Sequence, residues 1–300
     1  MSDYPVVIAG AGPVGLTLAI DLARRGIRSL LVERNRAPLR WPKMERCNAR
    51  TMEIYRRLGL SERIRAASKF IDVPMDVFCI LDLKSVPLAH IRFPSVTEAQ
   101  AQIARCSDGT LPREPYQLIS QYTLEPLLRD VVAGLPEVDV HYGCALTGFE
   151  QNADSVTVSL EFDDGRSLSV AGQYLVGTDG GASIVRKQLG VRFEGEGRIL
   201  ALRQILFRSE RLFAEIPIGP GRHYIWPHTG MVVQDDLRHF ALHTLDVSDA
   251  EGEATVRRIV DMDVDIEVLA DTRWVQNLLL VDRYSQGRVF LAGDSSHIVI

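Results

Sequence analysis

Apolar positions near the start of the chain follow two different periods, and together they predict a βαβ unit. Residues 5–9 form an unbroken apolar run, which is typical of a buried parallel strand. Apolar residues then recur at helical spacing as far as Gly26, and glycine commonly ends helices. A second apolar run covers residues 29–32 and ends at Glu33. This order predicts a strand, a helix and a parallel strand within about 30 residues.

The rest of the chain mixes helical and strand patterns. Helical spacing of apolar residues predicts helices over 48–67, 120–132 and 254–260. Alternating or continuous apolar positions predict a hairpin over 73–93 and strands over 138–146, 155–162, 168–176, 199–208, 230–245, 266–284 and 289–292. Prolines and Gly109 predict a loop over 94–115. The fold class that follows is α/β, with a parallel sheet and a second, β-rich region.

Composition narrows the class of protein. The chain has 300 residues, of which 46% are hydrophobic and 24% charged, so it is an ordinary globular chain and neither collagen-like nor disordered. No apolar run reaches the length of a membrane span, and the first residues do not resemble a secretory signal. We therefore expect a cytoplasmic protein with no stable membrane association.

The charge is unevenly placed along the chain. The net charge is −5, which argues against a nucleic-acid partner. Residues 1–70 nevertheless hold 14 Lys and Arg against 6 Asp and Glu, so the rest of the chain carries −13. This basic segment is either a solvated helix face or a binding region for a polyanionic cofactor. The four cysteines are widely spaced without a CxxC pair, which predicts reduced thiols and no metal site.

A glycine pattern at the end of the first predicted strand is the first candidate site. Gly10, Gly12 and Gly15 form GxGxxG between a strand and a helix, and Glu33 follows Gly15 by 18 residues. Such glycines permit a tight turn and close approach to a pyrophosphate, which the N–H groups of the helix N-terminus bind. Glu33 can accept a hydrogen bond from a ribose hydroxyl. The pattern predicts dinucleotide binding without separating FAD from NAD(P), and the alternative is a structural turn.

Two further pairs of glycine and aspartate follow predicted strands. Asp179 and Gly180 come after one apolar strand, and Gly293 and Asp294 come after another. Side chains at the carboxyl ends of parallel strands lie where α/β sheets bind ligands. Taken singly, the first pair is also typical of a turn, and the second is also typical of a helix N-cap.

Taken in order, these three motifs resemble those of the flavoprotein aromatic hydroxylases, the single-component FAD-dependent monooxygenases related to p-hydroxybenzoate hydroxylase. The matching stretches are VVIAGAGPVGLTLAIDLARRG, LLVERN, NARTMEIYRRLGL, SQYTLEPLLRD, YLVGTDGGASIVRKQLG and GRVFLAGDSSH, and they run from residue 5 to residue 297. The family continues past the last motif with a Pro- and Gly-rich loop and further helices, whereas this sequence stops at Ile300. We therefore expect an N-terminal portion of such an enzyme.

The resemblance implies two domains that interrupt one another. A Rossmann-like FAD-binding domain with a parallel sheet would comprise residues 1–70, 116–189 and 285–300. A β-rich substrate domain, inserted into the first, would comprise residues 71–115 and 190–284.

The resemblance also assigns FAD contacts to individual residues. Glu33 would hold the adenosine ribose, Gln121 would contact the flavin, and Asp294 would bind the ribityl chain. Lys43 and Arg46 are alternatives for covering the pyrophosphate, or both belong to a solvated basic loop. Around the cofactors, FAD and the nicotinamide that reduces it, the implied residues are Gly10, Gly12, Pro13, Val14, Gly15, Glu33, Arg34, Lys43, Arg46, Gln121, Asp179, Gly180, Gly293 and Asp294.

The reaction implied by the resemblance is the hydroxylation of an aromatic, phenol-type substrate. NADH or NADPH would reduce FAD, and the reduced flavin would take up O₂ as a C4a-hydroperoxide that transfers a hydroxyl group to the ring. The sequence assigns no catalytic side chain. Polar and aromatic residues on predicted strands of the second domain are the candidate substrate contacts, namely Arg203, Gln204, Tyr224, Trp226 and His228.

Three alternatives stay open at this point. The chain could be a flavoenzyme of the same fold that acts on a non-aromatic substrate, or a non-catalytic FAD-binding fragment. A plain NAD-dependent dehydrogenase is disfavoured by the second and third motifs. The oligomeric state is open, with a homodimer as one alternative.

Overall fold

The computed structural model describes residues 3–38 and 44–299, and the chain divides into two compact units. The first unit comprises residues 1–40, 124–199 and 276–300, and the second comprises residues 41–123 and 200–275.

These boundaries differ from the expected ones, because residues 41–70 and 116–123 belong to the second unit. Two contacts attach these segments to each other. The short strand β3 (Arg46–Cys47) pairs with β6 (Gln117–Leu118). The buried guanidinium of Arg65 donates hydrogen bonds to Glu114 at 2.6 Å and to Gln117 at 2.9 Å.

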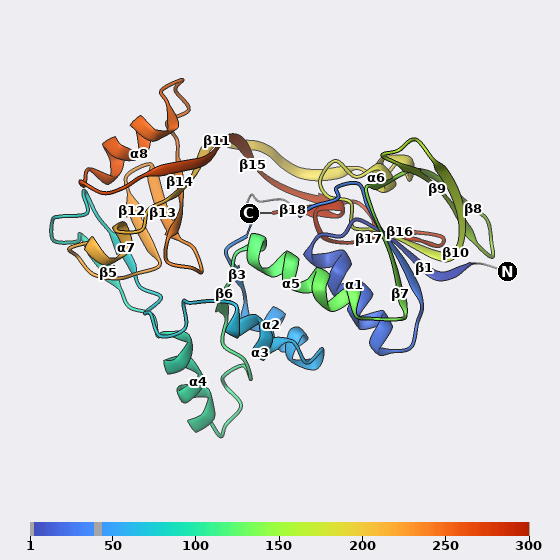
Figure 1. Ribbon diagram of the computed structural model, residues 1–300, viewed down its shortest axis with the longest axis horizontal. Coiled ribbons are helices and arrows are strands. Elements are labelled where there is room, and N and C mark those ends of the chain that lie inside the picture. Colours follow the sequence, from blue (N-terminus) through green and yellow to red (C-terminus); the bar gives the residue numbers. More distant parts are fainter. Residues whose placement is uncertain (1–2, 39–43, 300) are drawn as a thin grey trace. The chain divides into compact units, whose positions relative to one another are not determined.

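The sheet of the first unit has the strand order β16-β17-β10-β1-β2-β7 (Figure 1). Its members are β1 (Tyr4–Ala9), β2 (Ser29–Glu33), β7 (Val138–Tyr142), β10 (Ser167–Gly177), β16 (Ser285–Gln286) and β17 (Val289–Leu291). All neighbours pair in parallel except β16 with β17. Antiparallel strands β8 (Cys144–Gln151) and β9 (Val156–Phe162) continue from β10.

Helix α1 (Pro13–Arg24) connects β1 to β2 and packs on both strands. Pro13 is suited to the first turn, because its fixed φ is helical and its missing N–H would have no partner there. Leu16 and Ile20 are buried on one face at the spacing that the sequence predicts. The helix stops before Gly26, whose φ of +70° favours glycine.

The register of the parallel strands brings four strand ends to one level. Ala9 lies beside Val32 of β2 on one side and beside Gly177 of β10 on the other. Gly177 in turn lies beside Leu291 of β17. The glycine-rich turn and the two acidic motifs therefore follow directly at the carboxyl edge of a single sheet.

A second sheet has the strand order β18-β15-β11-β14-β13-β12-β4-β5 (Figure 1). Its members are β4 (Val77–Cys79), β5 (Ala89–Ile91), β11 (Phe193–Arg208), β12 (His223–Trp226), β13 (Thr229–Val233), β14 (His239–Thr244), β15 (Glu267–Val281) and β18 (His297–Ile298). Large side chains on one face of this sheet, among them Phe207, Tyr224 and Phe240, form a core with α8 (Gly252–Val260).

The remaining helices are α2 (Ala49–Arg57), α3 (Ser61–Ala66), α4 (Val96–Arg105), α5 (Gln121–Ala133), α6 (Ile184–Gln188), α7 (Leu212–Glu215) and the 3₁₀ turn η1 (Gly293–Ser295). Among the described helices, none is both long and apolar enough to cross a membrane.

The predicted loop over 94–115 was wrong in its first half, which forms α4. Ser95 and Glu98 make a capping box: the Ser95 hydroxyl accepts from the Glu98 N–H at 3.2 Å, and the Glu98 carboxylate accepts from the Ser95 N–H at 2.8 Å. The two bonds use N–H groups that would lack partners at the helix start. The expectation of a loop rested on the prolines and Gly109 alone, although the Ser-x-x-Glu spacing is present in the sequence.

Candidate functional site

The turn between β1 and α1 requires glycine at two of its three positions. Gly10 has φ +106°, and a Cβ there would lie 2.4 Å from the carbonyl oxygen of Thr178. A Cβ at Gly15 would lie 1.9 Å from the carbonyl oxygen of Gly10. Gly12 differs, because a Cβ there would meet nothing within 4 Å. Gly10 and Gly15 permit close packing of the turn, and Gly12 leaves open space beside it.

The same turn presents the N-terminus of a 12-residue helix. Gly12 is the N-cap of α1, and no side chain caps the helix. The first-turn residue Val14 is 43% exposed. Free N–H groups and the helix dipole make such an end attractive to an anion, and the missing side chain of Gly12 allows the anion to approach the backbone.

The carboxylate of Glu33 lies beside this turn. One of its oxygens accepts a hydrogen bond from the Ala11 N–H at 2.9 Å. The other oxygen accepts from the backbone N–H and the side-chain amide of Asn35, each at 2.9 Å. These bonds fix the carboxylate at the end of β2, next to the exposed Arg34. The predicted neighbours Glu33 and the glycine-rich turn are therefore in contact.

Thr178, Asp179 and Gly180 follow β10 at the same edge. The Thr178 hydroxyl donates to the carbonyl oxygen of Gly10 at 2.8 Å, which attaches this motif to the glycine-rich turn. The carboxylate of Asp179 accepts from the Ser183 hydroxyl at 2.5 Å and from the Ile184 N–H at 2.7 Å. Asp179 thus caps the start of α6, which is a use of this carboxylate that the sequence did not predict.

Gly293 and Asp294 follow β17 and complete the edge. Gly293 has φ +64°, and a Cβ there would lie 3.0 Å from the Val14 side chain, so this turn contacts the start of α1. The Ser295 hydroxyl donates to the carbonyl oxygen of Gly177 at 2.6 Å and holds the turn on the sheet. Asp294 is exposed, and within residues 3–38 and 44–299 no hydrogen bond engages its carboxylate. This carboxylate is available to a ligand.

The other predicted cofactor residues lie elsewhere in the chain. Arg46 is exposed on β3, and Gln121 begins α5 with its side chain buried; both belong to the second unit. The Gln121 N–H donates to the carbonyl oxygen of Met44 at 3.0 Å, so the two segments are joined within that unit. Lys43 lies outside the described residues.

Three of the predicted substrate residues make contacts inside the core of the second unit. Arg203 is buried and donates to the Asp271 carboxylate at 2.8 Å, and this hydrogen bond raises the pKa of Arg203. The Tyr224 hydroxyl donates to the carbonyl oxygen of Gly219 at 2.8 Å. Trp226 is buried in the same core. These groups have partners within the protein and stabilise the fold.

Two predicted substrate residues lie outside that core. His228 sits in the turn between β12 and β13 with φ +64°. Gln204 is buried on the opposite face of the sheet, directly across from His243 of β14. Within the described part of the chain, no hydrogen bond engages the Gln204 amide or the ring nitrogens of His243.

The residues that share this second face with Gln204 were not predicted from the sequence. His243 pairs with Gly230 of β13, and Gly230 pairs with Ile225 of β12. His223 lies two residues before Ile225 on the same strand and therefore on the same face. Burial, followed by the positive charge of Arg222, lowers the pKa of His223 to about 3, and burial lowers the pKa of His243. Both imidazoles are therefore uncharged at neutral pH.

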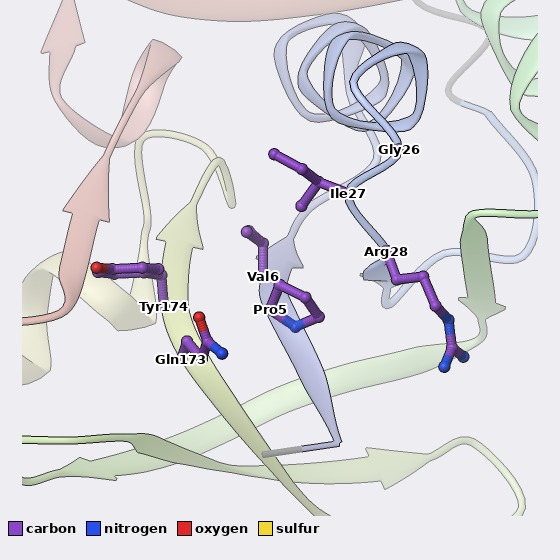
Figure 2. Close-up of a pocket in the computed structure, with 7 residues that line it drawn as sticks. All are labelled: Pro5, Val6, Gly26, Ile27, Arg28, Gln173 and Tyr174. Carbon is purple, nitrogen blue, oxygen red and sulfur yellow. The ribbon is translucent and has the colours of Figure 1, made fainter. Parts of the chain in front are cut away.

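A pocket in the first unit lies at the other edge of its sheet (Figure 2). Its lining comes from the start of β1, the turn after α1 and β10, and includes Pro5, Ile27 and Tyr174. The glycine-rich turn follows the opposite, carboxyl end of β1. This pocket is therefore separate from the edge where the sequence motifs gather.

A family model and two relatives match nearly the whole chain. A family model described as an FAD binding domain matches residues 3–300. The 12-dehydrotetracycline 5-monooxygenase/anhydrotetracycline 6-monooxygenase of Streptomyces rimosus is 32% identical over 98% of this chain and 58% of its own length. A flavin-dependent monooxygenase of Mycobacteroides abscessus is 32% identical over 98% of this chain and 62% of its own length.

Two solved structures also match nearly the whole chain. The substrate-free form of the rebeccamycin biosynthetic enzyme RebC matches with a TM-score of 0.88 and 29% identity, over 99% of this chain and 58% of its own. The flavin-dependent monooxygenase PieE, in complex with FAD and substrate, matches with a TM-score of 0.86 and 27% identity, over 99% of this chain and 54% of its own. The chain thus spans between half and two thirds of the length of these proteins.

Proposed function

Because the chain belongs to the FAD-binding domain family, we propose that it is part of a flavin-dependent monooxygenase that hydroxylates an aromatic ring, with O₂ and NADH or NADPH as co-substrates. The observation that carries the proposal is the single edge of the first sheet, where four strand ends meet. The glycine-rich turn, Thr178 and Asp294 follow those ends, and Glu33 is the last residue of β2.

The residues at this edge fit FAD. The open space at Gly12 and the uncapped start of α1 suit a pyrophosphate, which needs backbone N–H donors and close approach. The fixed carboxylate of Glu33 suits a ribose hydroxyl. The exposed carboxylate of Asp294 suits a second polyol, the ribityl chain. The contacts that the resemblance implies for Lys43, Arg46 and Gln121 stay predictions from the sequence.

When bound and reduced, FAD supplies the activation of O₂ that hydroxylation requires. The chain's own residues bind and orient. The N–H groups at the start of α1 would hold the pyrophosphate, Glu33 would bind the ribose, and Asp294 would bind the ribityl chain. Asp179 acts through structure, because its carboxylate holds the start of α6 at the turn after β10, and a cofactor contact of Gly180 stays a prediction. The protein must also exclude water around the reacting ring.

The names of the relatives point to the substrate class. The Streptomyces rimosus relative acts on tetracyclines, and another relative, from Streptomyces peucetius, is an aklavinone 12-hydroxylase. We assign this chain a hydroxylated aromatic substrate of the same kind, bound by the second unit.

A reducing, cytoplasmic compartment belongs to the same proposal, since all four cysteines are free thiols.

The test is the visible absorption spectrum of the purified chain reconstituted with FAD, repeated after NADPH is added without air. The proposal expects flavin bands that bleach with NADPH and a bleaching rate that rises with an added phenol. Bound flavin that NADH and NADPH both leave oxidised would support the alternative of a non-catalytic FAD-binding portion. A chain that binds no FAD would refute the assignment of the edge residues.

A further inference from the structure

An open space lies on the face of the second sheet that faces away from its core. Gly230 has ordinary strand geometry, and a Cβ at this position would meet nothing within 4 Å. Its cross-strand neighbours are His243 on one side and Ile225, which is 42% exposed, on the other. The missing side chain therefore leaves a gap between an imidazole and an aliphatic side chain.

The polar groups around this gap have unused hydrogen-bonding capacity. Gln204 is only 8% exposed, yet no hydrogen bond engages its amide within residues 3–38 and 44–299. The indole N–H of Trp274, whose ring lies edge-on to His243 with centroids 6.4 Å apart, is buried without a partner. The ring nitrogens of His223 and His243 likewise make no hydrogen bond to the described residues. Among these groups the Trp274 indole N–H is a fully buried donor without a partner in the described part of the chain, which is costly in a fold, and Gln204, His223 and His243 keep further donors and acceptors free on this face, so the face is suited to a polar ligand.

Burial is the main reason that the pKa of each imidazole is lowered, and the nearby charges act on the two imidazoles in opposite senses. Arg222 lies next to His223 in sequence and, with Arg46, disfavours a positive charge on His223. Arg222 is itself ion-paired with Glu45, and Glu45 is the charge that acts on His243 in the opposite sense. A neutral imidazole offers one N–H donor and one acceptor nitrogen, which matches a phenol hydroxyl.

We propose that the space over Gly230 holds the aromatic ring of the substrate, and that His223 and His243 bind its hydroxyl group by hydrogen bonds. The ring would lie between His243 and Ile225, where it covers the exposed aliphatic side chain. This inference rests on the proposed function for the identity of the substrate class. The gap itself and its unpaired polar groups are independent of FAD.

The test compares two probes that differ by one hydrogen-bond donor. The FAD-reconstituted chain is titrated by calorimetry with 2-naphthol and with its methyl ether, 2-methoxynaphthalene. One hydrogen bond predicts about tenfold tighter binding of 2-naphthol. In His223→Phe and His243→Phe this preference is expected to fall toward one in at least one variant, while the methyl ether binds as before. His243→Asn, which keeps a hydrogen-bonding group, should recover part of the preference.

Gly230→Val tests the space itself. Valine suits a strand, and its Cβ meets no neighbour, so the melting temperature should stay unchanged while both probes lose at least tenfold in affinity. The matched control for the two histidine-to-phenylalanine variants is His141→Phe on β7 of the first unit, which should leave the affinity for both probes unchanged.

The outcomes separate the two proposals. A 2-naphthol preference that survives in all histidine variants, or binding that survives in Gly230→Val, overturns the site over Gly230 but leaves flavin bleaching by NADPH untouched. A histidine variant that weakens both probes equally points to a structural role and also overturns the hydrogen-bonding assignment. Failure of the flavin bleaching with intact naphthol discrimination counts against the proposed function alone.

Discussion

Alanine at Gly12 and alanine at Gly15 should have opposite consequences, although both residues belong to one motif. Gly12 has φ −74° and ψ −179°, a conformation that alanine adopts freely, and its Cβ would meet no atom within 4 Å. The reduced freedom of the unfolded chain and the poorer N-cap nearly cancel, so we expect stability to change by less than about 0.5 kcal/mol. The new methyl group would instead occupy the space proposed for the pyrophosphate.

The cost to cofactor binding follows from the hydrogen bonds that the methyl group blocks. A hydrogen bond to a charged group contributes about 1.5–3 kcal/mol. Loss of one such bond in Gly12→Ala corresponds to a roughly 10- to 100-fold weaker affinity for FAD. In Gly15→Ala the added Cβ would lie 1.9 Å from the carbonyl oxygen of Gly10 and 2.7 Å from the Thr178 hydroxyl. Backbone must move to relieve this overlap, so we expect a loss of about 3 kcal/mol or more in stability.

Two measurements on each variant check the reasoning. Urea denaturation of the FAD-free chain measures the free energy of unfolding, and quenching of FAD fluorescence measures the dissociation constant. The expected result is a stable Gly12→Ala with weak FAD binding and an unstable Gly15→Ala. Wild-type FAD affinity in Gly12→Ala would refute the placement of the pyrophosphate at this turn. Wild-type stability in Gly15→Ala would refute the close packing of the turn.

Three further results are expected. Arg129→Met should lower the free energy of unfolding, measured in urea, by about 3 kcal/mol, because the nearly buried Arg129 donates to the buried Glu125 at 2.9 Å. Adding Glu125→Gln to the same chain should recover part of the lost stability. Asp294→Asn should weaken FAD binding roughly tenfold in a fluorescence titration and leave the FAD-free melting temperature unchanged, since the carboxylate is exposed. Burial lowers the pKa of His223 from 6.5 in the unfolded chain to about 3 in the fold. Between these two pH values His223 is protonated only in the unfolded chain, so stability should fall as pH drops from 6.5 toward 3. His223→Phe should flatten that pH dependence of the melting temperature, and an unchanged slope would count against the buried, neutral imidazole.

The gathering of the three motifs at one edge of the first sheet could be predicted, because the contacts that form this edge are local in the sequence. Gly10 and Gly15 are needed by contacts within one turn, and Glu33 contacts Ala11 across a single βαβ unit. Parallel strands that end in short motifs necessarily bring those motifs to one edge. The use of Asp179 could not be predicted in the same way, because its carboxylate caps a helix whose start depends on Ser183.

The second unit was predicted less well, because its contacts join distant segments. Residues 41–70 were expected with the first domain, and their position in the second unit depends on the pairing of Arg46 with Leu118 and on Arg65 with Glu114. Charged and polar residues like these give no periodic signal. Arg203 and Tyr224 were chosen as polar groups on strands, yet the alternation of side chains turns both toward the core.

The site proposed in the space over Gly230 depends on the register of the strands that form it. Gln204, His243 and Gly230 come from three strands, and only the pairing of β11, β14 and β13 places them in one row. A shift of β14 by one residue would turn His243 into the core and either Leu242 or Thr244 toward the gap. Register is set by turns and by core packing, here by the buried row of Ile205, Leu242 and Met231 on the other face. The apolar residues that the sequence shows plainly therefore position the polar residues that the chemistry needs, and those polar residues become recognisable only once the strands are paired.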